Sequence, residues 1–223
     1  MVHKIDDTIS PETAVLICAV LGNAVRWLRT IGNVSIGQRV AIVGPGQQGL
    51  AGVVAAKESG AGPVFVVGLS RDRDRLEMAR RFGADRVINA EKEDPVQIIS
   101  DHTQGAMAEL TMDATGHPSG ASLALSLAGT GATVILPGLY GPTTEVPLLL
   151  DRAVLKELTL KGVFSHDAPA VEAAIHAARQ DKYPLVEMIS HRFPLEKAED
   201  AIQLVGGSVP GETPLKVVLD PAL

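Results

Sequence analysis

Six residues in the first quarter of the chain have the types and the spacing of an anion-binding turn. The segment reads Gly44-Pro45-Gly46-Gln47-Gln48-Gly49, a G-x-G-x-x-G pattern. In such a turn the first glycine allows a tight bend, the second lets a phosphate approach the backbone, and the third lets a helix pack closely on a strand. Because the chain has 22 glycines in 223 residues, this spacing also arises by chance, and the flanking elements decide its meaning.

The elements around the turn favour a phosphate site. Residues 39–43 form a β-branched run that predicts a buried strand, and residues 48–59 have the period of a helix. A helix that begins at such a turn presents free N–H groups and the positive end of its dipole. We therefore expect a dinucleotide pyrophosphate to bind at Gly44, Gly46, Gln47, Gln48 and Gly49. The alternative is a tight strand-to-helix turn that binds no ligand.

Short β-branched runs alternate with longer helical stretches along most of the chain, which is typical of parallel strands joined by helical crossovers. Strands are predicted over residues 39–43, 63–67, 86–88, 109–113, 133–136 and 158–163. Helices are predicted over residues 48–59, 72–82, 95–102, 120–128 and 168–180. After residue 190 the pattern predicts a strand, a helix, a Gly/Pro-rich turn and a strand. We expect an α/β fold with a doubly wound, six-stranded parallel sheet of the Rossmann type.

The end of the second strand carries the residues that would select the dinucleotide. An acidic residue about 20 positions after the glycines would bond the ribose hydroxyls of NAD. The segment that follows the strand has no carboxylate before Asp72. Small Ser70 leaves room for a 2′-phosphate, and Arg71 or Arg73 would pair with that phosphate through a forked guanidinium. We expect NADP(H) to be preferred over NAD(H); the alternative is that these arginines alternate with acidic residues in a solvated helix start.

Composition and charge limit the classes of partner that the chain is expected to bind. The formal charge is −6, from 20 basic and 26 acidic side chains. Nucleic acid and anionic membrane surfaces attract clustered Lys and Arg, so neither partner is expected. No apolar run approaches the roughly 20 residues of a membrane-spanning helix. The single cysteine, Cys18, excludes an internal disulfide, and the first residues resemble no apolar leader, so a cytoplasmic setting is favoured.

Several segments in a fixed order resemble one enzyme family. The sequence looks like the C-terminal two-thirds of a medium-chain, zinc-type alcohol dehydrogenase, in the branch of the sorbitol and threonine dehydrogenases. Besides the glycine turn, the segments that carry the resemblance are Ile36-Gly37-Gln38-Arg39-Val40, Arg81-Phe82-Gly83-Ala84-Asp85, Asp113-Ala114-Thr115-Gly116, Pro137-Gly138-Leu139, Lys156-Glu157-Leu158-Thr159-Leu160-Lys161-Gly162 and Ser190-His191-Arg192-Phe193-Pro194-Leu195. Together they cover nearly the whole chain.

The resemblance implies further contacts with the cofactor. Thr115 and Gly116 after the fourth strand, with Gly138 and Leu139 after the fifth, would line the nicotinamide end of the cleft. Lys216 falls where similar enzymes carry a basic residue that reaches the pyrophosphate. The alternative for Lys216 is an exposed lysine on a strand.

The resemblance also implies that a catalytic domain is missing. Residues 1–30 would be a helical remnant of that domain, with a helix over residues 11–28. Residues 31–165 would be the NAD(P)-binding domain, and residues 166–223 a helix and tail that return toward the catalytic side. Cys18 lies near the family's last zinc ligand, but the partner ligands are missing, so we expect zinc to be absent. A cysteine on the apolar face of a helix is more often a buried small residue.

Three functions remain open. The first is the cofactor-binding part of an NAD(P)-dependent alcohol or polyol dehydrogenase, inactive alone. The second is a zinc-independent enzyme similar to the quinone oxidoreductases, and the third is a non-enzymatic dinucleotide-binding module. The family pairs its sheets edge to edge, which implies a homodimer through the edge strand at residues 158–163.

Overall fold

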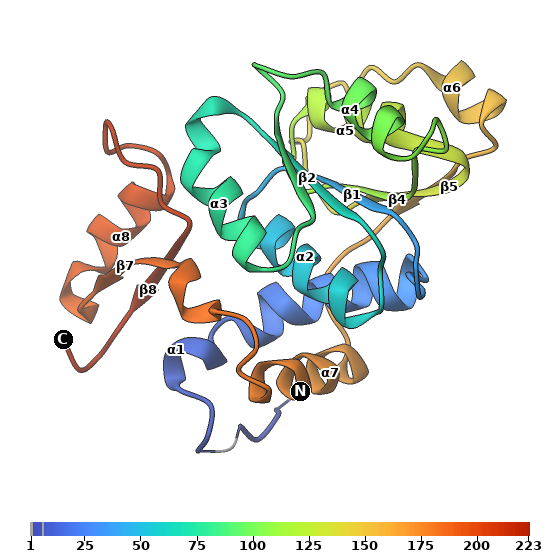
Figure 1. Cartoon of the computed structure of the whole chain (residues 1–223). Coiled ribbons are helices and arrows are strands. Elements are labelled where there is room, and N and C mark those ends of the chain that lie inside the picture. Colours follow the sequence, from blue (N-terminus) through green and yellow to red (C-terminus); the bar gives the residue numbers. More distant parts are fainter. Residues whose placement is uncertain (1, 6) are drawn as a thin grey trace.

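A computed structural model describes residues 2–5 and 7–223. At its centre lies a six-stranded parallel sheet with the strand order β3-β2-β1-β4-β5-β6 (Figure 1). The strands are β1 (Val40–Val43), β2 (Val64–Gly68), β3 (Arg86–Asn89), β4 (Ala108–Asp113), β5 (Ala128–Leu136) and β6 (Thr159–Gly162). The predicted α/β fold and its six-stranded parallel sheet are confirmed, although β5 begins earlier than predicted.

Helices cover both faces of this sheet, as a parallel sheet requires. In β1, Val40 and Ile42 belong to one apolar cluster and Ala41 and Val43 to the other, because successive side chains of a strand point to opposite faces. Figure 1 shows α4 and α5 above the sheet and α2 and α7 below it. These helices, together with α3, span α2 (Gln47–Glu58), α3 (Arg73–Arg81), α4 (Pro95–His102), α5 (Pro118–Leu127) and α7 (Ala168–Arg179).

Two helix starts show how local sequence sets these boundaries. The Asp94 carboxylate accepts the N–H groups of Val96 and Gln97 at 2.9 and 3.3 Å, just before α4. The Asp167 carboxylate accepts the N–H of Ala170 at 3.0 Å, just before α7. Such caps satisfy backbone donors that the helix itself leaves free.

The strand order reverses at the centre of the sheet. Both β2 and β4 pair in parallel with β1, so the chain winds outward in two directions from this strand. Val43, at the end of β1, lies in register with Val67 and with Asp113. Ligands of doubly wound sheets bind in the crevice beyond the carboxyl ends of the strands at such a reversal. A ligand site is therefore expected among the residues that follow Val43, Val67 and Asp113.

The N-terminal helical segment extends beyond residue 28, where the predicted helix ends, and much of it is π-helical. It comprises α1 (Pro11–Ala14), η1 (Ile17–Gly22) and η2 (Val25–Ile31). Widened turns occur in it, with bonds from the N–H of Leu21 to Leu16 and from that of Gly32 to Trp27. The segment over residues 11–31 is long and apolar enough to cross a membrane, which corrects the expectation that no apolar run reaches that length. Half of its most apolar window is nevertheless buried inside the protein, as in the core helix of a globular fold.

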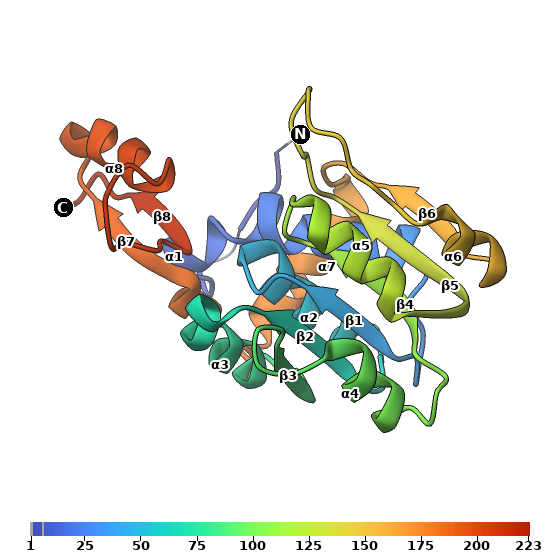
Figure 2. The same ribbon diagram turned by 90° about the horizontal axis from the view of Figure 1, so that it is seen from above.

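The C-terminal tail forms a small layer of its own. It contains η4 (Leu185–Met188), β7 (Ile189–Phe193), η5 (Leu195–Lys197), α8 (Ala198–Val205) and β8 (Lys216–Leu219), and the two strands pair in parallel. The order of strand, helix, turn and strand agrees with the sequence pattern. Figure 2 shows this layer apart from the main sheet, beyond α1 and α3.

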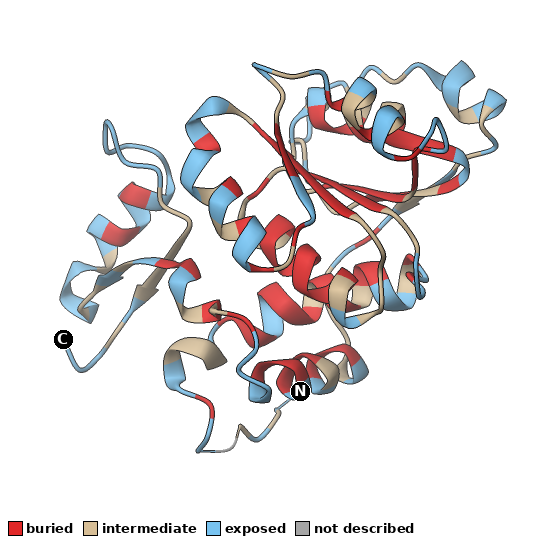
Figure 3. Ribbon diagram, viewed as in Figure 1, coloured by how far each residue is buried: buried red, intermediate tan, exposed pale blue. Residues whose placement is uncertain are grey.

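One helix, α6 (Leu150–Leu155), was not predicted from the sequence. None of its residues is buried, and Leu150, Val154 and Leu155 are exposed. The helix has only 6 residues, which is too short for a helical period to be recognised in the sequence. Figure 3 shows the contrast between this exposed helix and the buried strands.

Candidate functional site

The ends of β1, β2 and β4 enclose a cavity of about 380 Å³. Its lining includes Gly44 after β1, Arg71 after β2 and Thr115 after β4. It also includes Asp72 and His117, which were not among the predicted site residues. The cavity lies where the strand order reverses, so its position is that of a ligand crevice in a doubly wound sheet.

The three glycines of the turn fulfil distinct steric requirements. Gly44 has a φ of +97°, and a Cβ on it would lie 2.8 Å from Thr115 Cγ2. A Cβ on Gly49 would lie 1.9 Å from the Gly44 carbonyl oxygen, so only glycine allows α2 this close to the turn. A Cβ on Gly46 would meet no atom within 4 Å. Gly46 thus leaves open space above the backbone, as the approach of a phosphate requires.

The first turn of α2 has free hydrogen-bond donors. The backbone bond from the Leu50 N–H to the Gly46 oxygen measures 2.9 Å, and no side-chain hydrogen bond caps the helix. The N–H groups of Gln47, Gln48 and Gly49 are therefore left for a ligand anion, which the helix dipole also favours. The Gln48 side chain does not add to these free donors, since its amide nitrogen donates to the Ala19 oxygen at 2.8 Å. A dinucleotide pyrophosphate fits this turn through backbone groups.

The loop after β2 separates the two predicted arginines. Arg71 lines the cavity. Arg73 lies on a different surface, paired with Asp74 at 3.1 Å, and its side chain is 88% exposed. Of the two predicted arginines, Arg71 is therefore the one that lies beside this cavity.

Two carboxylates that were not among the predicted site residues also contact this loop. The Asp72 side chain accepts the Leu69 N–H at 3.0 Å, and that of Glu91 accepts the Ser70 N–H at 2.7 Å. The Ser70 hydroxyl accepts the Asn89 side-chain amide at 3.0 Å. Glu91 follows β3, and parallel strands end at the same edge of the sheet, which is the only sequence signal that would have pointed to it.

A buried carboxylate organises the other end of the cavity. Asp113 is fully buried and accepts the Thr115 N–H at 2.9 Å and the Thr115 hydroxyl at 2.6 Å. It also accepts the Tyr140 hydroxyl at 2.7 Å. Burial, followed by this hydrogen bond to Asp113, raises the pKa of Tyr140, so the phenol stays protonated and remains a donor. The bond fastens the loop after β5 to the end of β4.

The residues that were predicted to line the nicotinamide end of the cleft come together at this loop after β5. A Cβ on Gly138 would lie 2.8 Å from Gly116 Cα, so the two backbones approach closely. The ideal Cβ of Gly116 would lie 3.5 Å from the Leu139 oxygen, and the Leu139 side chain is exposed. Thr115, Gly116, Gly138 and Leu139 thus come together, with Tyr140 as an unpredicted member of the group.

Two further predicted residues, Cys18 and Lys216, do not line the cavity. Cys18 is exposed, which corrects its interpretation as a buried small residue. The buried stripe of its helix runs through Leu16, Ile17 and Val20, and Cys18 lies off that stripe. Lys216 lies on β8, outside the main sheet, and does not line the cavity.

The part of the chain that the structure describes contains no complete set of metal ligands. Within residues 2–5 and 7–223, no three His, Cys, Asp or Glu side chains gather closely enough to hold a metal ion. Catalytic zinc has about three protein ligands. Cys18 could therefore bind zinc only with ligands from beyond these residues, and no chemical step is assigned to a metal.

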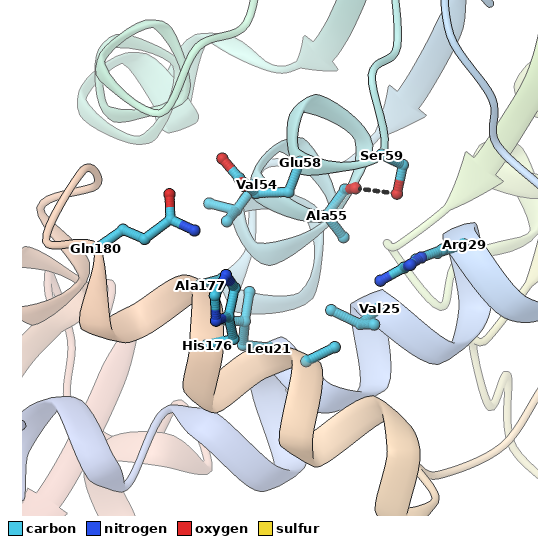
Figure 4. Close-up of a pocket in the computed structure, with 11 residues that line it drawn as sticks. Leu21, Val25, Arg29, Val54, Ala55, Glu58, Ser59, His176, Ala177 and Gln180 are labelled. Carbon is cyan, nitrogen blue, oxygen red and sulfur yellow. Dashed lines mark hydrogen bonds between the residues drawn. The ribbon is translucent and has the colours of Figure 1, made fainter. Parts of the chain in front are cut away.

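A second cavity, of about 360 Å³, lies at the other end of α2. Figure 4 shows Arg29, Glu58 and His176 among its lining residues, between the N-terminal helix, α2 and α7. Its lining includes Val54, Ala55 and Glu58, in the second half of α2, so it lies away from the glycine turn at the start of that helix. Glu58 is bound by Lys182 at 2.8 Å and by the Tyr183 hydroxyl at 2.6 Å, which lower its pKa against the raising effect of burial. These bonds join α2 to the segment after α7.

Comparison with known proteins assigns the chain to a family. The model of the zinc-binding dehydrogenase family matches residues 49–180. A probable alcohol dehydrogenase from Mycobacterium tuberculosis is 37% identical over 99% of this chain and 60% of that protein. Sorbitol dehydrogenase from Macaca fascicularis is 32% identical over 90% of this chain and 55% of its own length.

A solved structure shows the same relationship. The alcohol dehydrogenase from Thermotoga maritima superposes with a TM-score of 0.86 at 28% identity, over 97% of this chain and 59% of that one. The chain thus spans about three-fifths of the length of these relatives. The resemblance found in the sequence is confirmed, and the chain belongs to the zinc-binding dehydrogenase family.

Proposed function

We propose that the chain is the cofactor-binding part of an NAD(P)-dependent oxidoreductase of the alcohol or polyol dehydrogenase type. The observation that carries this proposal is the glycine turn, where open space at Gly46 meets an uncapped helix N-terminus. The names of the relatives, an alcohol dehydrogenase and a sorbitol dehydrogenase, support the substrate class. Residues 31–165 would form the cofactor domain.

Each part of the proposed cofactor site, which comprises the cavity and the adjoining glycine turn and loops, has a role. The N–H groups at Gln47, Gln48 and Gly49 bind the pyrophosphate, and Arg71 binds the 2′-phosphate of NADP(H), which we propose is preferred over NAD(H). The fastened loops at Thr115 and Gly138 hold the nicotinamide end in place. The bound nicotinamide supplies the ring carbon that exchanges hydride with the carbon of an alcohol.

The proposed chemistry needs groups beyond those of this cavity. No catalytic residue is assigned to the described part of the chain, and we propose that the chain alone binds the cofactor without turning over an alcohol. The proposal extends to a homodimer through β6, whose outer edge has no neighbouring strand in the sheet, and to a cytoplasmic setting.

Gly46→Ala is the direct test of the glycine turn. The added methyl group meets no protein atom within 4 Å, so the variant should fold normally while the methyl fills the space of the phosphate. The change in nicotinamide fluorescence on titration with NADPH and NADH measures binding. We expect the wild type to bind and Gly46→Ala to lose about tenfold or more in affinity.

Gly162→Ala is the matched control, because a Cβ at Gly162 also meets open space but lies on β6. It should bind like the wild type. Equal affinity of the wild type and Gly46→Ala would contradict the assignment of the pyrophosphate to this turn. Robust alcohol-dependent reduction of NADP+ by the purified chain would contradict its proposed inactivity alone.

A further inference from the structure

The loop after β2 contains a backbone N–H that could bind an anion, and a carboxylate of the protein itself already binds it. The Ser70 N–H follows the end of β2 and donates to Glu91 Oε2 over 2.7 Å. Glu91 follows Ala90, which lines the cofactor cavity together with Arg71. The carboxylate of Glu91 thus binds at the loop where the 2′-phosphate of NADP(H) would be bound.

The charge of Glu91 is maintained by its contacts. Hydrogen bonding by Ser70, through its side chain and then its backbone, lowers the pKa of Glu91, and the charge of Arg71 lowers it further. Lys92 acts in the same direction. Glu91 is therefore an anion at neutral pH, in the field of the same arginine that favours a 2′-phosphate.

A phosphate and a carboxylate compete for such groups because both accept charge-assisted hydrogen bonds from N–H donors and guanidinium groups. The free ribose of NAD(H) has a neutral 2′-hydroxyl, so it can bind without displacing an anion. The 2′-phosphate of NADP(H) would have to displace Glu91 or bind beside it against charge repulsion. The carboxylate of Asp72, at the same loop, is paired with Arg75 at 3.6 Å, so Glu91 is the acidic group that the phosphate would meet at Ser70.

We propose that Glu91 determines dinucleotide specificity by acting as a built-in competitor of the 2′-phosphate at the Ser70 N–H, in opposition to Arg71. The family pattern places such a determinant at the end of the second strand, where this chain has Gly68. Here the carboxylate comes from the end of the third strand and acts on the same loop. This inference rests on the proposed dinucleotide site.

Two substitutions at Glu91 test the competition. Glu91→Gln keeps an oxygen that can accept the Ser70 N–H but removes the charge, and Glu91→Ala also frees the donor. The ratio of the dissociation constants for NADPH and NADH, measured by fluorescence titration, should fall by about tenfold in either variant through tighter NADPH binding. The gain should shrink when Arg71→Ala is combined with Glu91→Gln, because the phosphate then lacks its cation.

Glu77→Gln is the matched control, since Glu77 pairs with Arg80 at 2.7 Å and does not line the cofactor cavity. It changes the net charge equally and should leave the ratio as in the wild type. An unchanged ratio in both Glu91 variants overturns the inference and leaves the dinucleotide site standing. A ratio that changes only through weaker NADH binding also overturns it, because Glu91 would then be a ligand of the ribose.

A separate measurement distinguishes failure of the inference from failure of the proposed function. Adenosine 2′,5′-bisphosphate and 5′-AMP, titrated against wild type and Glu91→Gln by calorimetry, differ only at the 2′-position. Tighter binding of the bisphosphate alone in Glu91→Gln supports the competition. If neither the nucleotides nor NADH and NADPH bind the wild type, the proposed function fails and the inference fails with it.

Discussion

The Tyr140 hydroxyl donates a hydrogen bond to the fully buried Asp113 carboxylate over 2.7 Å, and through it the loop after β5 is held against the end of β4. Thr115 supplies the other two bonds to this carboxylate. A buried charge with three donors is stable, whereas the removal of one donor leaves it partly unsatisfied. The two loops proposed to hold the nicotinamide end thus depend on one side chain outside the glycine turn.

Tyr140→Phe should therefore affect both stability and binding. The lost hydrogen bond to a charged group should cost about 1–3 kcal/mol in the free energy of unfolding. Urea denaturation measures this cost, and titration with NADPH should show weaker binding because the loops are less well held. Tyr183→Phe is the control, since it loses a bond of 2.6 Å to Glu58, far from the cofactor cavity. It should lower stability and leave NADPH affinity as in the wild type; equal losses of affinity in both variants would refute the positioning role of Tyr140.

Arg71→Ala should weaken NADPH binding selectively. A guanidinium bound to a phosphate is worth more than a surface pair, and its removal should cost about tenfold in NADPH affinity while NADH affinity changes much less. Arg73→Ala provides the comparison, because Arg73 lies two residues further on and points away from the cavity. If Arg73→Ala has the larger effect on NADPH, the assignment of the 2′-phosphate to Arg71 is wrong.

The bonds around Glu58 predict a dependence of stability on pH. The pKa of Glu58 lies below its ordinary value of 4.5 in the folded protein. A lowered pKa means that the contribution of Glu58 is fully present above the pKa of the unfolded chain and is lost as the pH falls through the folded pKa. The difference in urea stability between wild type and Glu58→Gln should be constant near neutral pH and shrink in acid. A difference that grows in acid would contradict this.

The edge strand β6 is the surface through which we expect two copies of the chain to associate. We expect a homodimer that light scattering detects at micromolar concentration. Leu155→Lys should favour the monomer, because Leu155 is 81% exposed on α6, which leads into the edge strand β6. Ile202→Lys changes an exposed residue of α8 instead and should leave the dimer intact. A monomeric wild type would remove the proposal.

The sequence by itself determined the order of the six strands in the main sheet and the glycine turn. Strands such as Val40–Val43 are short apolar runs between turn residues, and their local pattern is enough to identify them. The roles of Gly44 and Gly49 also follow from sequence, because the tight turn and the close helix depend on neighbouring backbone atoms. Features that arise within a few residues of the chain can be inferred without knowing the fold.

Only the tertiary structure decided which side chains meet in the loops that follow the strands. Glu91 contacts Ser70 and Tyr140 contacts Asp113 across gaps of 21 and 27 residues, and no local pattern marks such pairs. Arg71 and Arg73 were equivalent in sequence and differ only because the helix start turns one of them outward. The exposure of Cys18 likewise depends on which face of its helix packs on the core. These outcomes depend on packing between distant segments, which the sequence pattern alone does not contain.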